Sequence, residues 1–300
     1  MVWRRGADIH MQRTAVKDRE IVGIRPGALR TELIVVFVVI FLLAALLIPA
    51  VQRARNAARQ SMSRGHLKQW GLAVHNYEST YGRLPPGGWV LPDGTERHGW
   101  VTTLLPYLDS SPLYNDLDLN KSWHHPRNQP LCRWSVPYAL YPHAGVTTTA
   151  EGYGLVQYGV NANLMHRNSS LRFDEVVSGL GNTLLAGEIV GEYRPWGCPW
   201  TWRPIESPLN AGPRSYGHVG RDETEFVFAD GQLRTINKDI DPVVLQQLAS
   251  GGLLINADDV ALPPIPKVYP STKIHHPYKP RPKGEGWSPP PEWESAESNE

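Results

Sequence analysis

The chain has 300 residues, of which 41% are hydrophobic and 20% are charged, and its formal net charge is +1. This length suits one large domain or two small ones, and the near-zero charge excludes a protein drawn to nucleic acid by its overall field. Eleven Trp, 27 Gly and 27 Pro residues favour a loop-rich domain that contains β-structure. The two cysteines, Cys132 and Cys198, belong to no Cys/His cluster, which argues against structural zinc and leaves a disulfide between them open.

An uninterrupted apolar run, Leu33–Ile48, stands near the N-terminus. With the three residues that follow, it approaches the ~20 residues that a helix needs to cross a bilayer. A core helix that is apolar on every face over this length is rare. A cleaved secretory signal has a shorter apolar core and ends at a small-residue site, which is missing here. We therefore expect a single transmembrane helix over about residues 29–51.

Basic residues lie on both sides of this run. Six of them, which precede Arg30 and Glu32 at the start of the run, favour a cytoplasmic N-terminus and an extracytoplasmic domain, with the helix in the inner (cytoplasmic) membrane. They are Arg4, Arg5, Arg13, Lys17, Arg19 and Arg25. Five others follow the run closely, namely Arg53, Arg55, Arg59, Arg64 and Lys68, so charge counting by itself leaves the orientation open.

The helical pattern continues beyond Pro49. Apolar residues recur at spacings of three and four from Val51 to Tyr77, which indicates an amphipathic helix that needs a domain to cover one face. We expect one helix over residues 28–82, kinked at Pro49 and ending before the Leu84–Gly88 segment.

The segment around Gly27 resembles a type IV prepilin processing site. In that family a peptidase cuts after the Gly, and a Glu is the fifth residue of the mature chain. A cut after Gly27 makes Ala28 the first residue and Glu32 the fifth, since 32 − 27 = 5. It makes Pro49 the twenty-second, where pilins commonly have a kinking proline. The residues after Gly27 depart from the family's usual Phe and apolar start. The resemblance implies a prepilin peptidase and other pilin-like subunits as partners.

A series of motifs in a fixed order resembles the DUF1559 family of bacterial pilin-like proteins over residues 25–258. They include Leu72-Ala73-Val74-His75-Asn76-Tyr77, Leu84-Pro85-Pro86-Gly87, Leu104-Leu105-Pro106-Tyr107-Leu108, Tyr158-Gly159-Val160-Asn161, Gly181-Asn182-Thr183-Leu184-Leu185-Ala186-Gly187-Glu188 and Phe226-Val227-Phe228-Ala229-Asp230-Gly231. The family carries an H-X9-DG motif. Its counterpart here is His218 with Asp230 and Gly231, separated by eleven residues in place of nine. The resemblance implies an α+β fold, with a pilin-like N-terminal helix packed on an antiparallel β-rich domain.

Four parts are therefore expected. They are a cytoplasmic leader-like segment (1–27), the long helix (28–82), a β-rich extracytoplasmic domain (83–262) and a Pro-rich tail (263–300). The composition of the tail cannot supply a core, so we expect it to be extended or disordered. A passive tail is favoured over one that contacts a partner.

Asp230-Gly231 stands between two alternating segments, which predicts a two-residue hairpin turn with positive φ at both positions. We favour this turn over a metal or catalytic role. His218 is expected to form hydrogen bonds at the start of the hairpin, because no Ser or Cys is placed beside it as a nucleophile. The sequence contains no recognisable set of a nucleophile and its base, so an enzyme is not expected.

Carboxylates in this region are candidates for an oxygen-ligated calcium site, with a solvated charged loop as the simpler alternative. They are Asp222, Glu223, Glu225 and Asp230. Their spacing matches no EF-hand loop, and no other cofactor is expected. The adjacent pairs His124-His125 and His275-His276 are not expected to bind metal, because neighbouring side chains diverge.

Three indoles, Trp196, Trp200 and Trp202, fall within seven residues. We favour a core or subunit contact over a platform that stacks a sugar, although aromatic residues serve both purposes. The sequence therefore predicts a membrane-anchored pilin- or pseudopilin-like structural or interaction protein, related to type II secretion or type IV pilus-like assemblies. The alternative is a membrane-tethered module that binds an extracellular solute or glycan.

Overall fold

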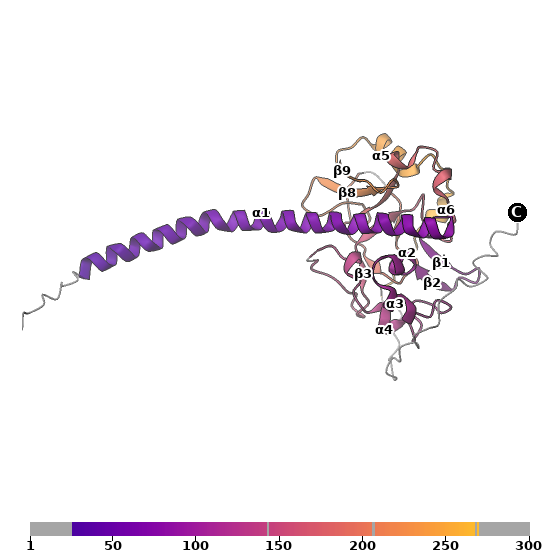
Figure 1. Ribbon diagram of the computed structural model, residues 1–300, viewed down its shortest axis with the longest axis horizontal. Coiled ribbons are helices and arrows are strands. Elements are labelled where there is room, and N and C mark those ends of the chain that lie inside the picture. The colour runs from indigo at the N-terminus through magenta and orange to yellow at the C-terminus, as the bar shows by residue number, and fades with distance from the viewer. Residues whose placement is uncertain (1–25, 143, 206–207, 268, 270–300) are drawn as a thin grey trace, which may run out of the picture. The chain divides into compact units, whose positions relative to one another are not determined.

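The structure is a computed structural model that describes residues 26–142, 144–205, 208–267 and 269 (Figure 1). The side chains of residues 26–32 are not described. The leader-like segment up to residue 25 and the tail from residue 270 lie outside the described residues. The chain divides into two units, Met1–Arg55 and Asn56–Glu300.

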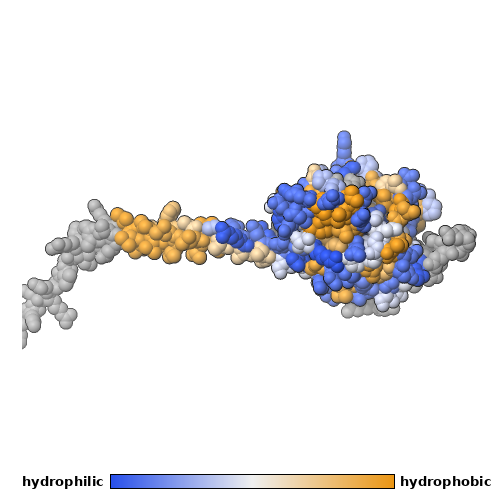
Figure 2. All heavy atoms as spheres, turned by 90° about the horizontal axis from the view of Figure 1, so that it is seen from above, coloured by the Kyte–Doolittle hydropathy of each residue, from blue (hydrophilic) through white to orange (hydrophobic). Residues whose placement is uncertain are grey.

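The first unit contains the N-terminal part of helix α1, which runs over Pro26–Tyr81 and passes through Pro49 without a break. The predicted helix is therefore confirmed, within two residues at each end, while a kink at Pro49 stays a prediction. The apolar run is exposed along its length, with Phe41 at 73% and Leu46 at 72%. Among the described residues, α1 is the one helix that is long and apolar enough to cross a membrane. Figure 2 shows the run as a continuous hydrophobic surface.

The second unit is built on the C-terminal part of α1. From Ser63 onward one stripe of this helix is buried, including Leu67, Trp70 and Val74, while Arg64 and Lys68 remain exposed. Spacings of three and four place the buried side chains on one helix face, which explains why the amphipathic pattern of the sequence ends in a covered helix.

A five-stranded sheet has the strand order β7-β4-β5-β8-β9. Its strands are β4 (Tyr158–Asn161), β5 (Leu184–Glu188), β7 (Trp202–Arg203), β8 (Glu223–Phe228) and β9 (Leu233–Asn237). Neighbouring strands pair antiparallel except β4 and β7, which pair parallel through Val160 and Trp202. The α+β fold is thus confirmed, with a mixed sheet where a purely antiparallel one was expected.

Smaller elements complete the second unit. Two two-stranded antiparallel sheets pair β1 (Gly88–Val90) with β2 (Glu96–Gly99), and β3 (Leu155–Val156) with β6 (Arg194–Pro195). The short helices are α2 (Trp100–Leu104), α3 (Ser111–Asp116), α4 (Gln129–Cys132), α5 (Pro242–Ser250) and α6 (Ala257–Val260). Short 3-10 turns are η1 (Leu105–Tyr107), η2 (Pro137–Ala139), η3 (Phe173–Glu175) and η4 (Leu180–Asn182).

The start and the end of helix α5 are both explained by the residues at its caps. The carboxylate of Asp241 accepts a hydrogen bond of 2.8 Å from the backbone N–H of Val243, and Pro242 occupies the first turn. Gly251 ends the helix with a φ of 61°, a conformation that costs glycine little.

The sheet separates two apolar clusters. Leu185 and Val227 belong to the cluster that contains Leu67 and Trp70 of α1. Their strand neighbours Leu184, Phe226 and Phe228 belong to the other cluster, together with Leu245 and Ala249 of α5. Because successive side chains of a strand point to opposite faces, α1 covers one face of the sheet and α5 the other.

The Leu84–Gly88 segment, which follows α1, passes close to the backbone of two other segments. A β-carbon on Gly87 would lie 2.3 Å from the carbonyl oxygen of Met165, and one on Gly88 would lie 1.9 Å from that of Pro199. Both distances exclude any side chain, so the two glycines are needed where β1 crosses these loops.

The first residues of the predicted tail contact the domain. Tyr269 is 6% exposed, and its ring centre lies 5.9 Å from that of Trp123. Its backbone N–H donates to Glu151, and the guanidinium of Arg194 donates to the carbonyl oxygen of Pro263. The tail was expected to supply no core, yet Tyr269 belongs to the apolar core of the domain.

A buried histidine lies in β2. His98 is 1% exposed, and its Nε2 lies 3.0 Å from the carbonyl oxygen of Lys121. Burial, which disfavours the charged imidazolium, lowers the pKa of His98 to about 4. The folded protein therefore holds a neutral ring at a pH where the unfolded chain, with a pKa of about 6.5, takes up a proton.

This difference predicts a pH-dependent stability. Above pH 6.5 both states are neutral and the full stability is present, and it falls as the pH drops from 6.5 towards 4. Between pH 7.5 and pH 5, we expect the full chain in detergent to lose about 2 kcal/mol more than its His98→Gln variant. Urea unfolding at both pH values measures this, and equal losses in the two proteins would contradict it.

Candidate functional site

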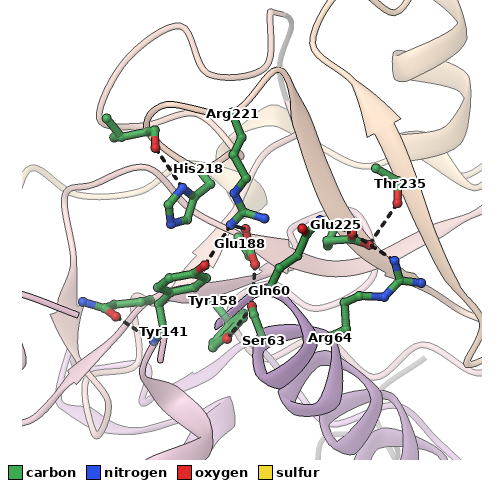
Figure 3. A network of polar contacts seen from close by, with 12 residues as sticks. Gln60, Ser63, Arg64, Tyr141, Tyr158, Glu188, His218, Arg221, Glu225 and Thr235 are labelled. Carbon is green, nitrogen blue, oxygen red and sulfur yellow. Dashed lines mark hydrogen bonds and ion pairs between the residues drawn. The ribbon is translucent and has the colours of Figure 1, made fainter. Parts of the chain in front are cut away.

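Two buried carboxylates lie side by side where α1 begins to pack on the sheet (Figure 3). Glu188 ends β5 and is 2% exposed, and Glu225 of β8 is 1% exposed. Gly187 pairs with Phe226 across the two strands, so the two glutamates are the next residues along each. A buried charge is costly unless it is paired, so the partners of these carboxylates decide whether the fold is stable.

Glu188 is held by a serine of α1 and an arginine of the loop before β8. The hydroxyl of Ser63, which is fully buried, donates to Glu188 Oε1. Arg221 Nη2 donates to Oε2 at 2.8 Å. Ser63 Oγ also lies 2.8 Å from the hydroxyl of Tyr158 in β4. Desolvation raises the pKa of Glu188, and the guanidinium of Arg221 acts against that rise.

Glu225 joins α1 to the two last strands. It accepts hydrogen bonds of 3.2 Å from Gln60 Nε2 and from Arg64 Nη1, both on α1. Thr235 Oγ1 of β9 donates to its other oxygen at 3.1 Å. We call Gln60, Ser63, Arg64, Glu188, Arg221 and Glu225 the polar joint, because these side chains connect the helix to the sheet.

His218 lies at the rim of the polar joint and not inside it. Its ring centre lies 4.4 Å from that of Tyr141, at an interplanar angle of 52°. Arg221 contacts the same tyrosine, with its Cζ 5.5 Å from the ring centre and its Nη2 3.3 Å from the hydroxyl. Partial burial, together with Arg221, lowers the pKa of His218, so its ring is neutral at pH 7.

The chemistry open to the joint follows from its burial. Ser63, Tyr158 and Glu188 include a hydroxyl and a carboxylate in hydrogen-bond contact, as in some catalytic sites. Each of the three is 2% exposed or less, so a substrate does not reach them in this structure. The arrangement fixes the helix in position on the sheet.

The Asp230-Gly231 prediction is confirmed as a hairpin and corrected in its turn type. Gly231 has a φ of 78°, whereas Asp230 is not among the described residues with positive φ. The N–H of Gly231 donates to Phe228 and that of Phe228 donates to Gln232. The loop is therefore a type I turn completed by a left-handed glycine, the three-residue form of a hairpin connection.

The turn has a packing role against α1. A β-carbon on Gly231 would lie 3.7 Å from His75 Nε2, and one on Gly71 would lie 2.8 Å from a methyl group of Val227. The helix and the hairpin thus approach each other closely at two glycines. His218 precedes β8, whereas Asp230 and Gly231 follow it. The three motif residues therefore stand at opposite ends of this strand and do not form one site.

Three of the four carboxylates proposed for calcium, all but Glu223, have different partners. Asp222 pairs with Lys238 at 2.7 Å, Asp230 lies 3.6 Å from Arg234, and Glu225 belongs to the polar joint. Within the described residues, no three His, Cys, Asp or Glu side chains gather as metal ligands. The four therefore do not form the oxygen cage that calcium requires.

The three indoles proposed as a ligand platform lie in the core. Trp196 and Trp202 are fully buried and Trp200 is partly buried. Their N–H groups donate to the carbonyl oxygens of Trp134 and Val260 and, from Trp200, to Glu96 at 2.7 Å. The core interpretation is thus supported, and no free indole face is left on Trp196 or Trp202 for a sugar.

Both cysteines are free thiols in the structure, so the proposed disulfide is not formed there. Burial raises the pKa of Cys198 to about 12 and also raises that of Cys132. Both thiols therefore stay protonated at neutral pH and are poor nucleophiles.

The remaining predicted sites are not members of the joint. Gly27 and Ala28 fall in the first turn of α1 and Glu32 in a later one, and their side chains are not described. His124 contacts Ser122, whereas Nδ1 of His125 accepts from the N–H of Arg127, so this pair shares no ligand position. The pair at 275–276 lies outside the described residues.

Sequence reasoning missed the polar joint. The helical pattern of the sequence is defined by its apolar residues, so it does not single out Ser63, and Arg221 lies outside any regular element. One signal was present: Glu188 ends a segment of five buried residues, and a charge at such a position requires a partner.

Comparison with known proteins supports the resemblance of the motifs. Residues 52–161 match a family described as "Protein of unknown function (DUF1559)". This part of the chain extends from the middle of α1 to the end of β4, so the resemblance to that family is confirmed over these residues. No curated protein and no solved structure matches the chain.

The joint predicts a cost for removing one hydroxyl group. Ser63→Ala leaves Glu188 and Tyr158 each without one hydrogen-bond partner, which costs about 1–3 kcal/mol, offset by about 0.5 kcal/mol of helix propensity. We expect a net loss of about 1–2 kcal/mol in the free energy of unfolding, measured by urea denaturation.

Ser61→Ala is the matched control. Ser61 is exposed on the same helix, so this variant receives the gain in propensity and loses no buried contact. Equal unfolding free energies for the two variants would show that the Ser63 hydroxyl does not hold the joint.

Proposed function

We propose that this chain is a membrane-anchored, pilin-like structural or interaction protein. The observation that carries the proposal is the division of α1 into two chemically different parts. The run Leu33–Ile48 is exposed and apolar on every face, whereas the part from Ser63 onward is buried in the domain on one face. An exposed apolar helix of this length is unstable in water and stable in a bilayer.

The polar joint supports a structural role. A helix anchored in a membrane transmits any force on it to the domain through its contacts. Here those contacts include Arg64 with Glu225 and Ser63 with Glu188, which lie on neighbouring central strands of the sheet. The helix is therefore attached to interior strands of the five-stranded sheet.

The proposal also includes the orientation of the helix in the membrane and the location of the domain. The basic residues before the apolar run favour a cytoplasmic N-terminus, with the domain outside the inner membrane. The motif around Gly27 favours processing by a prepilin peptidase, which would leave Ala28 as the first residue. Glu32 would then neutralise the terminal amine of a neighbouring subunit, as the pilin resemblance implies.

Membrane insertion predicts resistance to alkaline extraction. We expect the full chain to remain in the membrane pellet after a carbonate wash. The double change Val39→Arg with Leu42→Arg should release it, because each central arginine costs about 2.5–3.5 kcal/mol of insertion free energy. Leu72→Arg is the control, since Leu72 is exposed on the second part of α1. Release of the unchanged chain would refute the anchor.

Processing predicts a loss of mass. Co-expression with a prepilin peptidase should remove residues 1–27, and intact mass with N-terminal sequencing should give Ala28. Gly27→Glu should prevent the cut, because the peptidase of the family cleaves after a glycine. Gly65→Glu is a matched control, since Gly65 has open space around it. A wild-type chain that keeps Met1 would be a plain signal-anchored protein.

A further inference from the structure

Two arginines follow the apolar run, and the described part of the chain supplies no counter-ion for them. Arg53 and Arg55 lie five and seven residues beyond Ile48, and both are exposed. The sequence contains no Asp or Glu from Leu33 to Tyr77. Among the described residues, no carboxylate forms an ion pair with either guanidinium, whereas Arg64 pairs with Glu225.

Their distance from the run fits the headgroup layer of a bilayer. A helix rises ~1.5 Å per residue, so Arg53 lies ~7.5 Å and Arg55 ~10.5 Å beyond the end of the run. The headgroups extend ~5–8 Å beyond the hydrocarbon on each side, and an arginine side chain can reach back towards them along the helix. Positions two residues apart on a helix correspond to a rotation of ~200°, so the two guanidinium groups face different headgroups.

We propose that Arg53 and Arg55 bind the phosphates of anionic phospholipids at the membrane surface next to the end of the apolar run. A guanidinium donates two parallel hydrogen bonds to a phosphate, which suits it to this contact. The inference rests on the proposed membrane anchor and names the lipid class that the anchor selects.

A second copy of the chain fits this surface less well. A neighbouring copy inserted in the same direction brings its own Arg53 and Arg55 to the same depth, and the 33–77 stretch supplies no carboxylate to meet them. Like charges at this depth repel, whereas anionic headgroups between the copies neutralise both.

The experiment uses the full chain in nanodiscs that contain equimolar phosphatidylglycerol and phosphatidylcholine with identical acyl chains. Native mass spectrometry of the released protein counts the lipids of each class that stay bound. We expect phosphatidylglycerol to be enriched, and the enrichment to fall about fivefold for each arginine changed to glutamine. Raising the ionic strength should weaken the enrichment in the wild-type protein.

Lys68→Gln is the matched control for Arg53→Gln, because it removes one exposed positive charge from the part of α1 that packs on the domain. It should leave the enrichment unchanged. Enrichment that survives Arg53→Gln with Arg55→Gln, or that is missing from the wild-type protein, would overturn the inference. Failure of the chain to enter nanodiscs would instead refute the membrane anchor, so the two failures are distinguishable.

Discussion

The burial of two adjacent glutamates beneath α1 is the constraint on which the second unit depends. Glu188 and Glu225 occupy neighbouring central strands, and each is paired with a cation and a polar residue of the helix or its surroundings. Two carboxylates at this depth repel each other and lose their hydration. The helix can pack on the sheet here because Ser63, Gln60 and Arg64 interrupt its apolar stripe at this level.

Beyond the joint, the contact between helix and sheet becomes apolar and close. Leu67, Trp70 and Val74 are buried further along α1, and Gly71 lets the helix approach Val227. Polar pairs fix position and orientation, because they tolerate few geometries, while apolar burial supplies most of the free energy. The joint therefore sets the register in which the apolar stripe meets the sheet.

Patterns that act over short distances were legible in the sequence. The apolar run, the helix stripe and the hairpin at Asp230-Gly231 each depend on residues that are neighbours in the chain. The joint could not be found in this way, because Ser63 and Glu188 are 125 positions apart and Arg221 lies in an irregular loop. The parallel pairing of β4 with β7 and the insertion of Tyr269 were missed for the same reason, since each depends on a distant partner.

The two parts of α1 differ in their surroundings, and the composition of the sequence changes from one part to the other. Side chains from Leu33 to Ile48 lack any polar group, so they suit lipid on all sides. From Gln60 onward, Gln60, Ser63 and Arg64 contact the buried glutamates, and one apolar stripe packs into the core. Between these parts lie Arg53 and Arg55, which suit neither a hydrocarbon nor a protein interior without a partner. A change from lipid to headgroup to protein along one helix accounts for all three compositions, whereas a helix in water accounts for none of the first sixteen apolar positions.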